Sequence, residues 1–133
     1  MVRAYVIKLM LVFTSLIIAA PLLAAPQLVK DISKPILVSK KNPEFSLQLP
    51  ANPTTGYLWL LKGNYNANLI EPVKQIYRVN NNKLIGSPGF DTWTFRVKPL
   101  ALIVPTILQL NLIYTRSWEK HAAKTIKLKI ISS

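Results

Sequence analysis

Apolar and polar residues alternate along most of this chain, and this two-residue period limits the folds it can adopt more than any other feature. The period is clearest in DTWTFRVK, where Trp93, Phe95 and Val97 alternate with polar residues. No segment carries ten residues of amphipathic helical pattern, so the sequence predicts strands and no long helix. The predicted strands lie at residues 36–39, 44–49, 57–62, 73–79, 91–98, 105–116 and 124–131.

Ten prolines and clusters of Asn, Gly and Ser separate these strand-like segments. Their number and spacing predict an all-β fold, an antiparallel immunoglobulin-like β-sandwich of about seven to eight strands. The nearly continuous apolar run YLWLLK, residues 57–62, predicts a central strand. The chain has no cysteine, so no disulfide joins the sheets and the fold depends on its hydrophobic core.

The first 25 residues have the layout of a secretory signal peptide. Arg3 and Lys8 precede an apolar stretch from Leu9 to Ala20, and small residues follow at Ala24 and Ala25. Cleavage near Ala24 or Ala25 would release the protein into the periplasm or the medium, with no stable membrane insertion afterwards. The alternative is an uncleaved membrane anchor, because the apolar segment is near the lower limit of about 17 residues for a membrane-spanning helix.

Residues 26–133 are long enough for a single domain, which we expect to be monomeric. Without Arg3 and Lys8 this domain has fifteen basic and five acidic residues, a net charge of +10. Such a charge favours acidic proteins, anionic envelope polymers, lipid head groups or nucleic acid as partners. The other interpretation is solubility, because the lysines of KTIKLKI alternate with apolar residues and would form a solvated face. Nucleic acid is not expected, because an exported protein has little access to it.

The residues needed for catalysis are missing from this sequence. There is no cysteine, and the sole histidine, His121, lies in a polar segment between two predicted strands. Zinc sites normally use three or four protein ligands, which this composition does not supply. The five acidic residues are scattered, with no spacing that suggests a catalytic pair; they are Asp31, Glu44, Glu71, Asp91 and Glu119. The sequence therefore predicts a binding protein without enzymatic activity, metal or cofactor.

Three loops are candidates for a binding site, because loops at one end of a sandwich commonly carry one. The first loop comprises Asn52, Pro53, Thr54, Thr55, Gly56 and Tyr57. The second loop comprises Gly86, Ser87, Pro88 and Gly89. The third loop comprises Arg116, Ser117 and Trp118.

Each loop has a local property that suits binding. In the first, Pro53 fixes its own φ angle and Gly56 supplies the positive φ that closes a turn. In the second, the glycines permit close approach of a partner's backbone. In the third, Arg and Trp are residue types enriched among interface hot spots. Each loop also has a simple structural interpretation. The first could be an ordinary turn, the second an ordinary hairpin, and Trp118 of the third a core residue.

Together and in this order, the three loops resemble the chagasin family of inhibitors of papain-like cysteine peptidases. The resemblance spans roughly Pro43 to Ile131 and rests on NPTTG followed by an aromatic residue, a Gly-rich loop and an Arg-Pro-Trp loop. The first motif matches fully. Pro88 stands where Gly is frequent, and Ser117 stands where the family has Pro, which should leave the third loop less rigid.

The resemblance implies an immunoglobulin-like sandwich whose three loops form a wedge in the protease cleft. The Thr-containing loop would lie nearest the catalytic Cys and His, with the other two beside it. Inhibition would be reversible and competitive. Two alternatives remain: an exported basic module that binds anionic envelope polymers or acts in adhesion, and a hydrolase with an unrecognised site.

Overall fold

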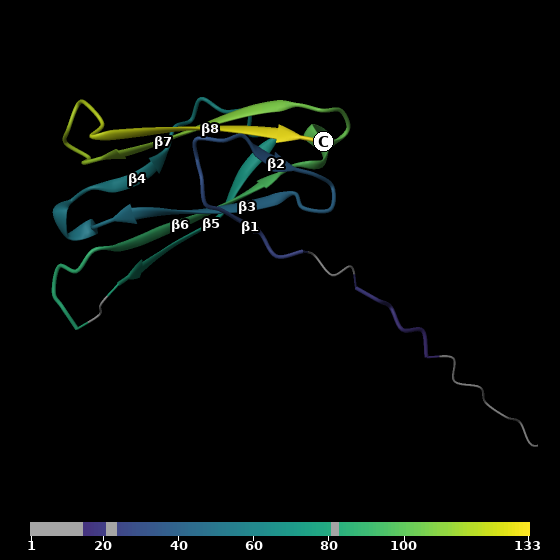
Figure 1. Cartoon of the computed structure of the whole chain (residues 1–133), viewed down its shortest axis with the longest axis horizontal. Helices are drawn as coiled ribbons and strands as arrows, with labels where there is room; N and C mark the ends of the chain where they lie inside the picture. Colours follow the sequence, from purple (N-terminus) through teal and green to yellow (C-terminus); the bar gives the residue numbers. More distant parts are fainter. Residues whose placement is uncertain (1–14, 21–23, 81–82) are drawn as a thin grey trace, which may run out of the picture.

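The computed structural model describes residues 15–20, 24–80 and 83–133. The predicted signal peptide therefore lies mostly outside the described residues. Residues 15–20 and 24–26 are exposed, have no regular secondary structure and lead away from the folded domain (Figure 1). The described part of the chain contains no helix with the length and apolarity needed to cross a membrane.

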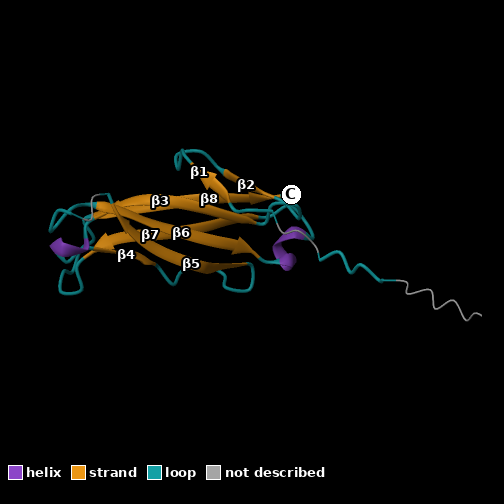
Figure 2. Cartoon of the chain, turned by 90° about the horizontal axis from the view of Figure 1, so that it is seen from below, coloured by secondary structure: helices purple, strands orange, loops and turns teal. Residues whose placement is uncertain are grey.

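In the described part of the chain, eight strands form two four-stranded sheets that pack face to face (Figure 2). The first sheet has the order β1 (Gln27–Val29), β3 (Glu44–Ala51), β6 (Gly89–Val97) and β5 (Ile70–Val79). The second has the order β2 (Ile36–Val38), β8 (Lys124–Ser132), β7 (Ile107–Thr115) and β4 (Leu58–Leu61). Two short 3₁₀ helices complete the described elements, η1 (Pro53–Thr55) and η2 (Pro99–Leu102). The predicted β-sandwich is confirmed.

The two N-terminal strands depart from the antiparallel arrangement. β1 pairs in parallel with β3, and β2 pairs in parallel with β8, whereas the remaining pairs are antiparallel. Both are three residues long and lie at sheet edges. The connection between them crosses from one sheet to the other instead of turning back as a hairpin, so no tight turn imposes an antiparallel direction.

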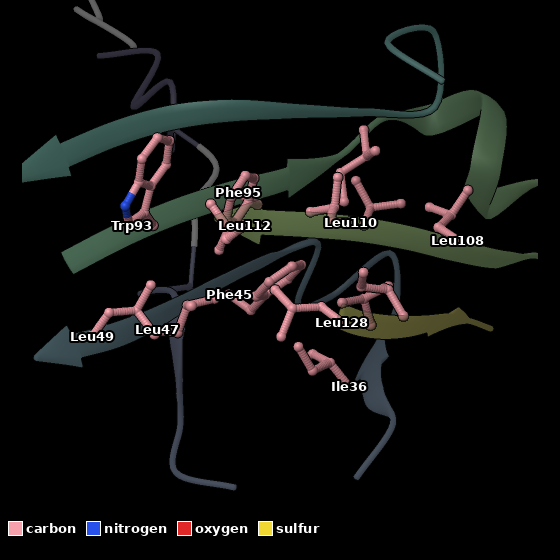
Figure 3. Packing of buried hydrophobic residues seen from close by; sticks show 14 of the residues in the cluster. Ile36, Phe45, Leu47, Leu49, Trp93, Phe95, Leu108, Leu110, Leu112 and Leu128 are labelled. Carbon is pink, nitrogen blue, oxygen red and sulfur yellow. The ribbon is translucent and has the colours of Figure 1, made fainter. Parts of the chain in front are cut away.

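The core lies between the inner faces of the sheets, as the alternation predicts (Figure 3). Phe45 stacks on Phe95 with ring centroids 5.5 Å apart, and Trp93 stacks on Phe95 at 5.9 Å. Leucines of the second sheet face these rings, among them Leu110 and Leu128. Lys127 and Lys129 of β8 lie on the outer face, as the KTIKLKI pattern predicts, whereas Lys124 has the strand parity of Leu128 and is exposed at the start of β8.

The expectation of a central strand at residues 57–62 was wrong. β4 is the edge strand of the second sheet and pairs with β7. Trp59 points into the core, but Leu58 and Leu60 point outward and are about half exposed. An apolar run identifies a strand but does not show which strands pair with it. In β4 the inward and outward positions alternate, and the outward positions are leucines.

The strand directions gather three connections at one end of the sandwich, which we call the loop pole. β3, β5 and β7 end there, and β4, β6 and β8 begin there. The loop pole therefore carries residues 52–57, 80, 83–88 and 116–123, which together with Gly89 at the start of β6 include the candidate binding loops. The connections 39–43, 62–69 and 98–106 lie at the opposite pole.

Candidate functional site

The first loop is a single 3₁₀ turn that its own sequence determines. Pro53 begins the turn with its fixed φ angle, and Gly56 ends it in the left-handed region with φ of 81°. The N–H of Thr55 donates to the carbonyl of Asn52 at 3.1 Å, and the N–H of Gly56 donates to that of Pro53 at 3.0 Å.

The two threonine hydroxyls stiffen this turn from within. The Thr54 hydroxyl donates to Oδ1 of Asn52 at 2.5 Å, and the Thr55 hydroxyl donates to the Asn52 carbonyl at 2.6 Å. Both threonines remain exposed. Because each hydroxyl proton is used inside the loop, the outward face offers hydroxyl lone pairs and methyl groups in a fixed arrangement.

Aromatic side chains fasten the first loop to the core. The N–H of Asn52 donates to the Tyr114 hydroxyl at 3.1 Å. The Tyr114 ring packs between Tyr57 and Trp59, at centroid distances of 5.1 Å and 4.8 Å. Trp59 is 3% exposed, and its indole N–H donates to the Pro50 carbonyl at 2.9 Å. The loop thus rests on packed rings rather than on solvent.

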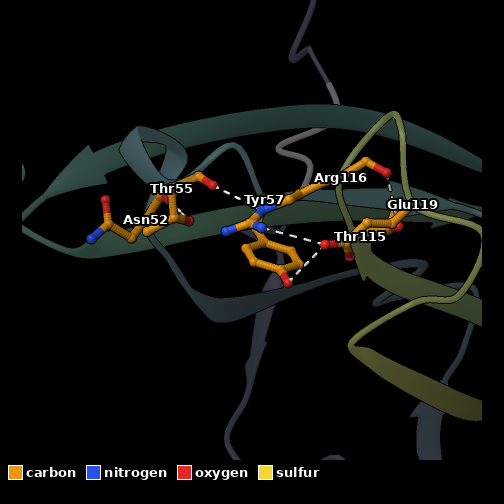
Figure 4. A network of polar contacts seen from close by, with 6 residues as sticks. All are labelled: Asn52, Thr55, Tyr57, Thr115, Arg116 and Glu119. Carbon is orange, nitrogen blue, oxygen red and sulfur yellow. Dashed lines mark hydrogen bonds and ion pairs between the residues drawn. The ribbon is translucent and has the colours of Figure 1, made fainter.

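Arg116 joins the third loop to the first (Figure 4). Its Nε donates to the Thr55 carbonyl at 3.0 Å, and its guanidinium lies 4.2 Å from the centre of the Tyr57 ring. Glu119 holds the other side, with its Oε1 3.4 Å from Nη1 of Arg116 and 3.3 Å from the Tyr57 hydroxyl. Arg116 and Glu119 are only partly exposed, so solvent screens this ion pair incompletely.

Trp118 projects from the loop pole and is 70% exposed. Its ring edge lies over Gly56, where an added Cβ would come 2.9 Å from Cη2. The Arg116 guanidinium lies 5.8 Å from the Trp118 ring centre. The prediction that Trp59 and Trp93 are core residues is confirmed, and the interpretation of Trp118 as a core tryptophan is excluded.

The second loop presents aliphatic side chains that the sequence reasoning missed. The N–H of Ser87 donates to the Leu84 carbonyl at 3.3 Å, and Gly86 has φ of 76°, which describes a type II turn over residues 84–87. Ile85 is at the tip of this turn and is fully exposed, and Leu84 is largely exposed. The sequence did contain a signal for the exposure of Ile85, because a glycine at the third position of a turn places the residue before it at the apex.

The two glycines of the second loop have different roles. Gly86 takes the positive φ angle that the turn requires. Gly89 is buried at the start of β6, and a Cβ there would overlap the carbonyl oxygen of Arg78 on β5. Close packing against the β5 backbone therefore explains why position 89 requires glycine. Pro88 lacks an N–H, but its carbonyl accepts a hydrogen bond from the N–H of Asn80 at 3.0 Å.

The three loops lie side by side, with the first in the middle. Nδ2 of Asn52 donates to the Gly86 carbonyl at 3.2 Å, which links the first loop to the second. The hydrogen bond from Arg116 to Thr55 links the first loop to the third. The structure thus brings the predicted site residues together on one surface, except for Gly89, which lies beneath it.

The described residues offer no arrangement for catalysis on this surface. His121 is exposed, and no group of three His, Asp or Glu side chains in the described part of the chain could hold a metal ion. Glu119 is engaged by Arg116 and Tyr57. The site offers a preformed shape with apolar tips and fixed hydrogen-bonding groups, which suits binding to a partner.

Comparisons with known proteins agree with this geometry. The sequence model of the chagasin family of peptidase inhibitors, I42, matches residues 39–130. Among solved structures, the cysteine protease inhibitor EhICP2 from Entamoeba histolytica is similar, with a TM-score of 0.61 and 16% sequence identity. The similarity covers 80% of this chain and 92% of that chain. No curated protein matches the sequence.

The family match covers most of the chain and includes all three loops of the loop pole. The family is one of inhibitors, which agrees with the prediction of a protein that is not an enzyme. The sandwich fold, the three adjacent loops and the family match lead to one conclusion: this chain belongs to the chagasin family of peptidase inhibitors.

Proposed function

We propose that this protein is a reversible, competitive inhibitor of papain-like cysteine peptidases, and that the three loops form a wedge in the active-site cleft. The observation that carries the proposal is the preformed first loop, which is held between the other two. A loop that is rigid before binding loses little conformational entropy on docking. The solved relative in fold is itself described as a cysteine protease inhibitor.

The chemistry of the first loop fits a narrow cleft around a thiolate and an imidazolium. Thr54 and Thr55 are small, uncharged and exposed at the middle of the loop surface. Ile85 on one side and Trp118 on the other provide the large apolar side chains. Such anchors commonly supply most of the affinity of an interface. The wedge therefore combines a stiff uncharged centre with an apolar contact on each flank.

Reversible inhibition is expected because the chain has no group that would modify the enzyme. It contains no cysteine that could form a mixed disulfide. The 3₁₀ turn at Pro53–Thr55 also departs from the extended backbone of a substrate, which would hinder cleavage of the loop.

Kinetic measurement with papain and a fluorogenic peptide tests the proposal. We expect the apparent KM to rise with inhibitor concentration while the maximal rate stays constant, and activity to return after dilution. Activity that stays lost after extensive dilution, with inhibitor attached or cut, would contradict the mechanism. A folded inhibitor without effect on papain-like peptidases would contradict the function.

We also propose that the protein acts after export, as a monomer in the periplasm or the medium. The proposal rests on the charged, apolar and small-residue regions of the first 25 residues. Fractionation of the producing cells with mass spectrometry of the N terminus tests it. A mature chain that begins at Ala25 or Pro26 is expected, and an intact N terminus in the membrane fraction would support an anchor instead.

A further inference from the structure

The opposite pole exposes a group of aliphatic side chains on the connection between β6 and β7. Leu100 is 57% exposed, Ile103 69% and Val104 61%, whereas Ala101 and Leu102 between them are buried. Residues three apart in a 3₁₀ turn lie on the same side. Leu100 and Ile103 therefore share the outer side of η2, while the turn's buried residues face the core.

This apolar surface continues onto the outer face of the second sheet. The strand register places Leu37 of β2 beside Ile131 of β8, and Ile131 beside Ile107 of β7. Leu37 and Ile107 are largely exposed. The apolar pole patch is defined here by its exposed members: Leu37, Leu100, Ile103, Val104 and Ile107.

The exposure of the patch does not come from a loosely held loop. The Ser132 hydroxyl donates to the Ala101 carbonyl at 2.5 Å, and the N–H of Thr106 donates to the same hydroxyl oxygen at 2.9 Å. The N–H of Ser132 in turn donates to the Thr106 carbonyl at 2.9 Å. These bonds tie the connection to the C-terminal strand, so its aliphatic side chains are held facing solvent. Exposed apolar patches of this kind commonly mark interaction sites.

Exposed lysines border the patch. Lys40 and Lys41 lie on the turn between β2 and β3 at the same pole, and Lys40 lines a pocket together with Pro99 and Leu102. Lys129 on β8 lies one outward-facing position along the strand from Ile131. Within residues 15–20, 24–80 and 83–133, none of these three lysines forms an ion pair.

The acidic residues form no ion pair with these lysines in the described part of the chain, because each acid has other partners; Glu44 lines the same pocket as Lys40 but is paired with Arg96. Four form ion pairs, and the fifth, Asp91, is buried and accepts hydrogen bonds from Trp93 and Gln75. These four acids form five ion pairs: Asp31 with Lys34, Glu44 with Arg96, Glu71 with Arg96 and with Lys98, and Glu119 with Arg116. Hydrogen bonds from the Ser33 hydroxyl and backbone N–H also lower the pKa of Asp31.

We propose that the opposite pole is a docking surface for a bilayer that contains anionic lipids. The aliphatic side chains of the patch would enter the interfacial layer, and the bordering lysines would contact the lipid head groups. Binding would be peripheral, because the patch is a group of side chains on a folded domain. It would leave the loop pole facing away from the membrane, so the proposal does not depend on the peptidase target.

Three arguments favour a membrane over other occupants of the patch. A second copy of the chain would bring together two domains of charge +10, which repel each other. An anionic polymer would use the lysines but would leave the aliphatic side chains in water. The chain also enters the domain at this pole, because Ala24 lines the pocket with Pro99 and Leu102 (Figure 2). Under the export proposed above, the apolar segment before Ala24 would bring this pole to the membrane.

Cosedimentation with vesicles tests the proposal on a chain that begins at Pro26. This chain retains every strand, from Gln27 onward, and every buried core residue, from Ile36 onward. The probes are vesicles of phosphatidylcholine mixed with phosphatidylglycerol in equal parts, and vesicles of phosphatidylcholine alone. We expect binding to the mixed vesicles and much weaker binding to the neutral ones. Absence of binding to the mixed vesicles would overturn the proposal.

Paired variants separate docking at this pole from attraction by net charge. Lys40→Gln with Lys41→Gln should weaken binding to the mixed vesicles roughly tenfold or more. The matched control, Lys120→Gln with Lys124→Gln, makes the same charge change at the loop pole and should weaken binding less than about threefold. Equal losses in the two pairs would overturn the proposal.

An apolar pair tests the aliphatic part of the docking surface. Ile103→Ser with Val104→Ser leaves the charge unchanged and should also weaken vesicle binding roughly tenfold or more, because it removes aliphatic groups that would enter the interfacial layer. Both positions are exposed, so the variant should fold and its thermal unfolding midpoint should be unchanged. Unchanged vesicle binding by this folded pair, or wild-type binding to heparin without binding to vesicles, would overturn the proposal in favour of a purely electrostatic surface.

Discussion

The first and second loops lie side by side, but they owe their shapes to different interactions. The first loop is fixed by its own proline, glycine and threonine hydroxyls and by Arg116 of the third loop. The second loop is one hydrogen-bonded turn that holds Ile85 in solvent. The comparison indicates that the first loop contributes a preformed shape, whereas the second contributes apolar surface for burial. Two of the four variants below test this division directly, and the other two test the third loop that supports the first; they run from the largest expected effect to the smallest.

Thr54→Lys with Thr55→Lys should abolish the contribution of the first loop to inhibition. Two long charged side chains would stand where the cleft requires small uncharged ones, so inhibition of papain should weaken by more than about a hundredfold. Both positions are exposed, and surface changes usually cost about 0.5 kcal/mol or less, so the thermal midpoint should shift by a few degrees at most.

The matched control is Ile103→Lys with Val104→Lys, which adds the same charge at exposed positions of the opposite pole. This control should inhibit papain as well as the wild type. If the threonine pair also inhibits normally while folded, the contact surface lies elsewhere on the domain.

Trp118→Ala should weaken inhibition by about thirtyfold, which corresponds to a loss of about 2 kcal/mol for a hot-spot anchor. Its stability should change little, because the side chain is mostly exposed. Trp59→Ala is the contrasting variant, since it empties a core position and should cost about 3–5 kcal/mol of unfolding free energy. Inhibition constants measured beside thermal midpoints separate the two, and the reverse pattern would remove Trp118 from the interface.

Ile85→Ser tests whether the second loop acts through apolar burial. Fully burying an isoleucine side chain contributes about 1.5–3 kcal/mol, and the lower end of this range corresponds to a weakening of inhibition by roughly tenfold. The Gly86 turn should persist, because its backbone hydrogen bond does not involve the Ile85 side chain. Val104→Ser, an exposed aliphatic position at the opposite pole, is the control. Equal inhibition by Ile85→Ser and the wild type would show that the second loop tip remains in solvent in the complex.

Ser117→Pro should produce the smallest change, a gain in affinity. The N–H of Glu119 donates to the Arg116 carbonyl at 3.1 Å, so Ser117 occupies the second position of a β-turn, where proline is favoured. Proline there would restrict the unbound loop and stabilise it by about 0.4–1 kcal/mol, which is roughly two- to fivefold in affinity. A thermal midpoint that falls would show that the backbone at residue 117 does not suit proline.

The sequence by itself determined the sandwich and the shape of the first loop. Alternation in EFSLQL and DTWTFRVK follows the side-chain period of a strand, and the buried faces that it predicts are those of the structure. Pro53 and Gly56 restrict their own φ angles, so NPTTG specifies its local turn, which Tyr114 and Arg116 then hold in place. The exposure of Trp118 followed in the same way from its polar neighbours.

The tertiary structure decided which segments are neighbours. An apolar run does not reveal which strands it pairs with. The edge position of β4, and the parallel pairing of β1 with β3 and of β2 with β8, followed from chain crossings between the sheets. Arg116 meets Thr55 across 61 residues of sequence, and Gly89 is required because the β5 backbone passes over it. These features depend on long-range packing, which fixes distances between residues that no local pattern connects.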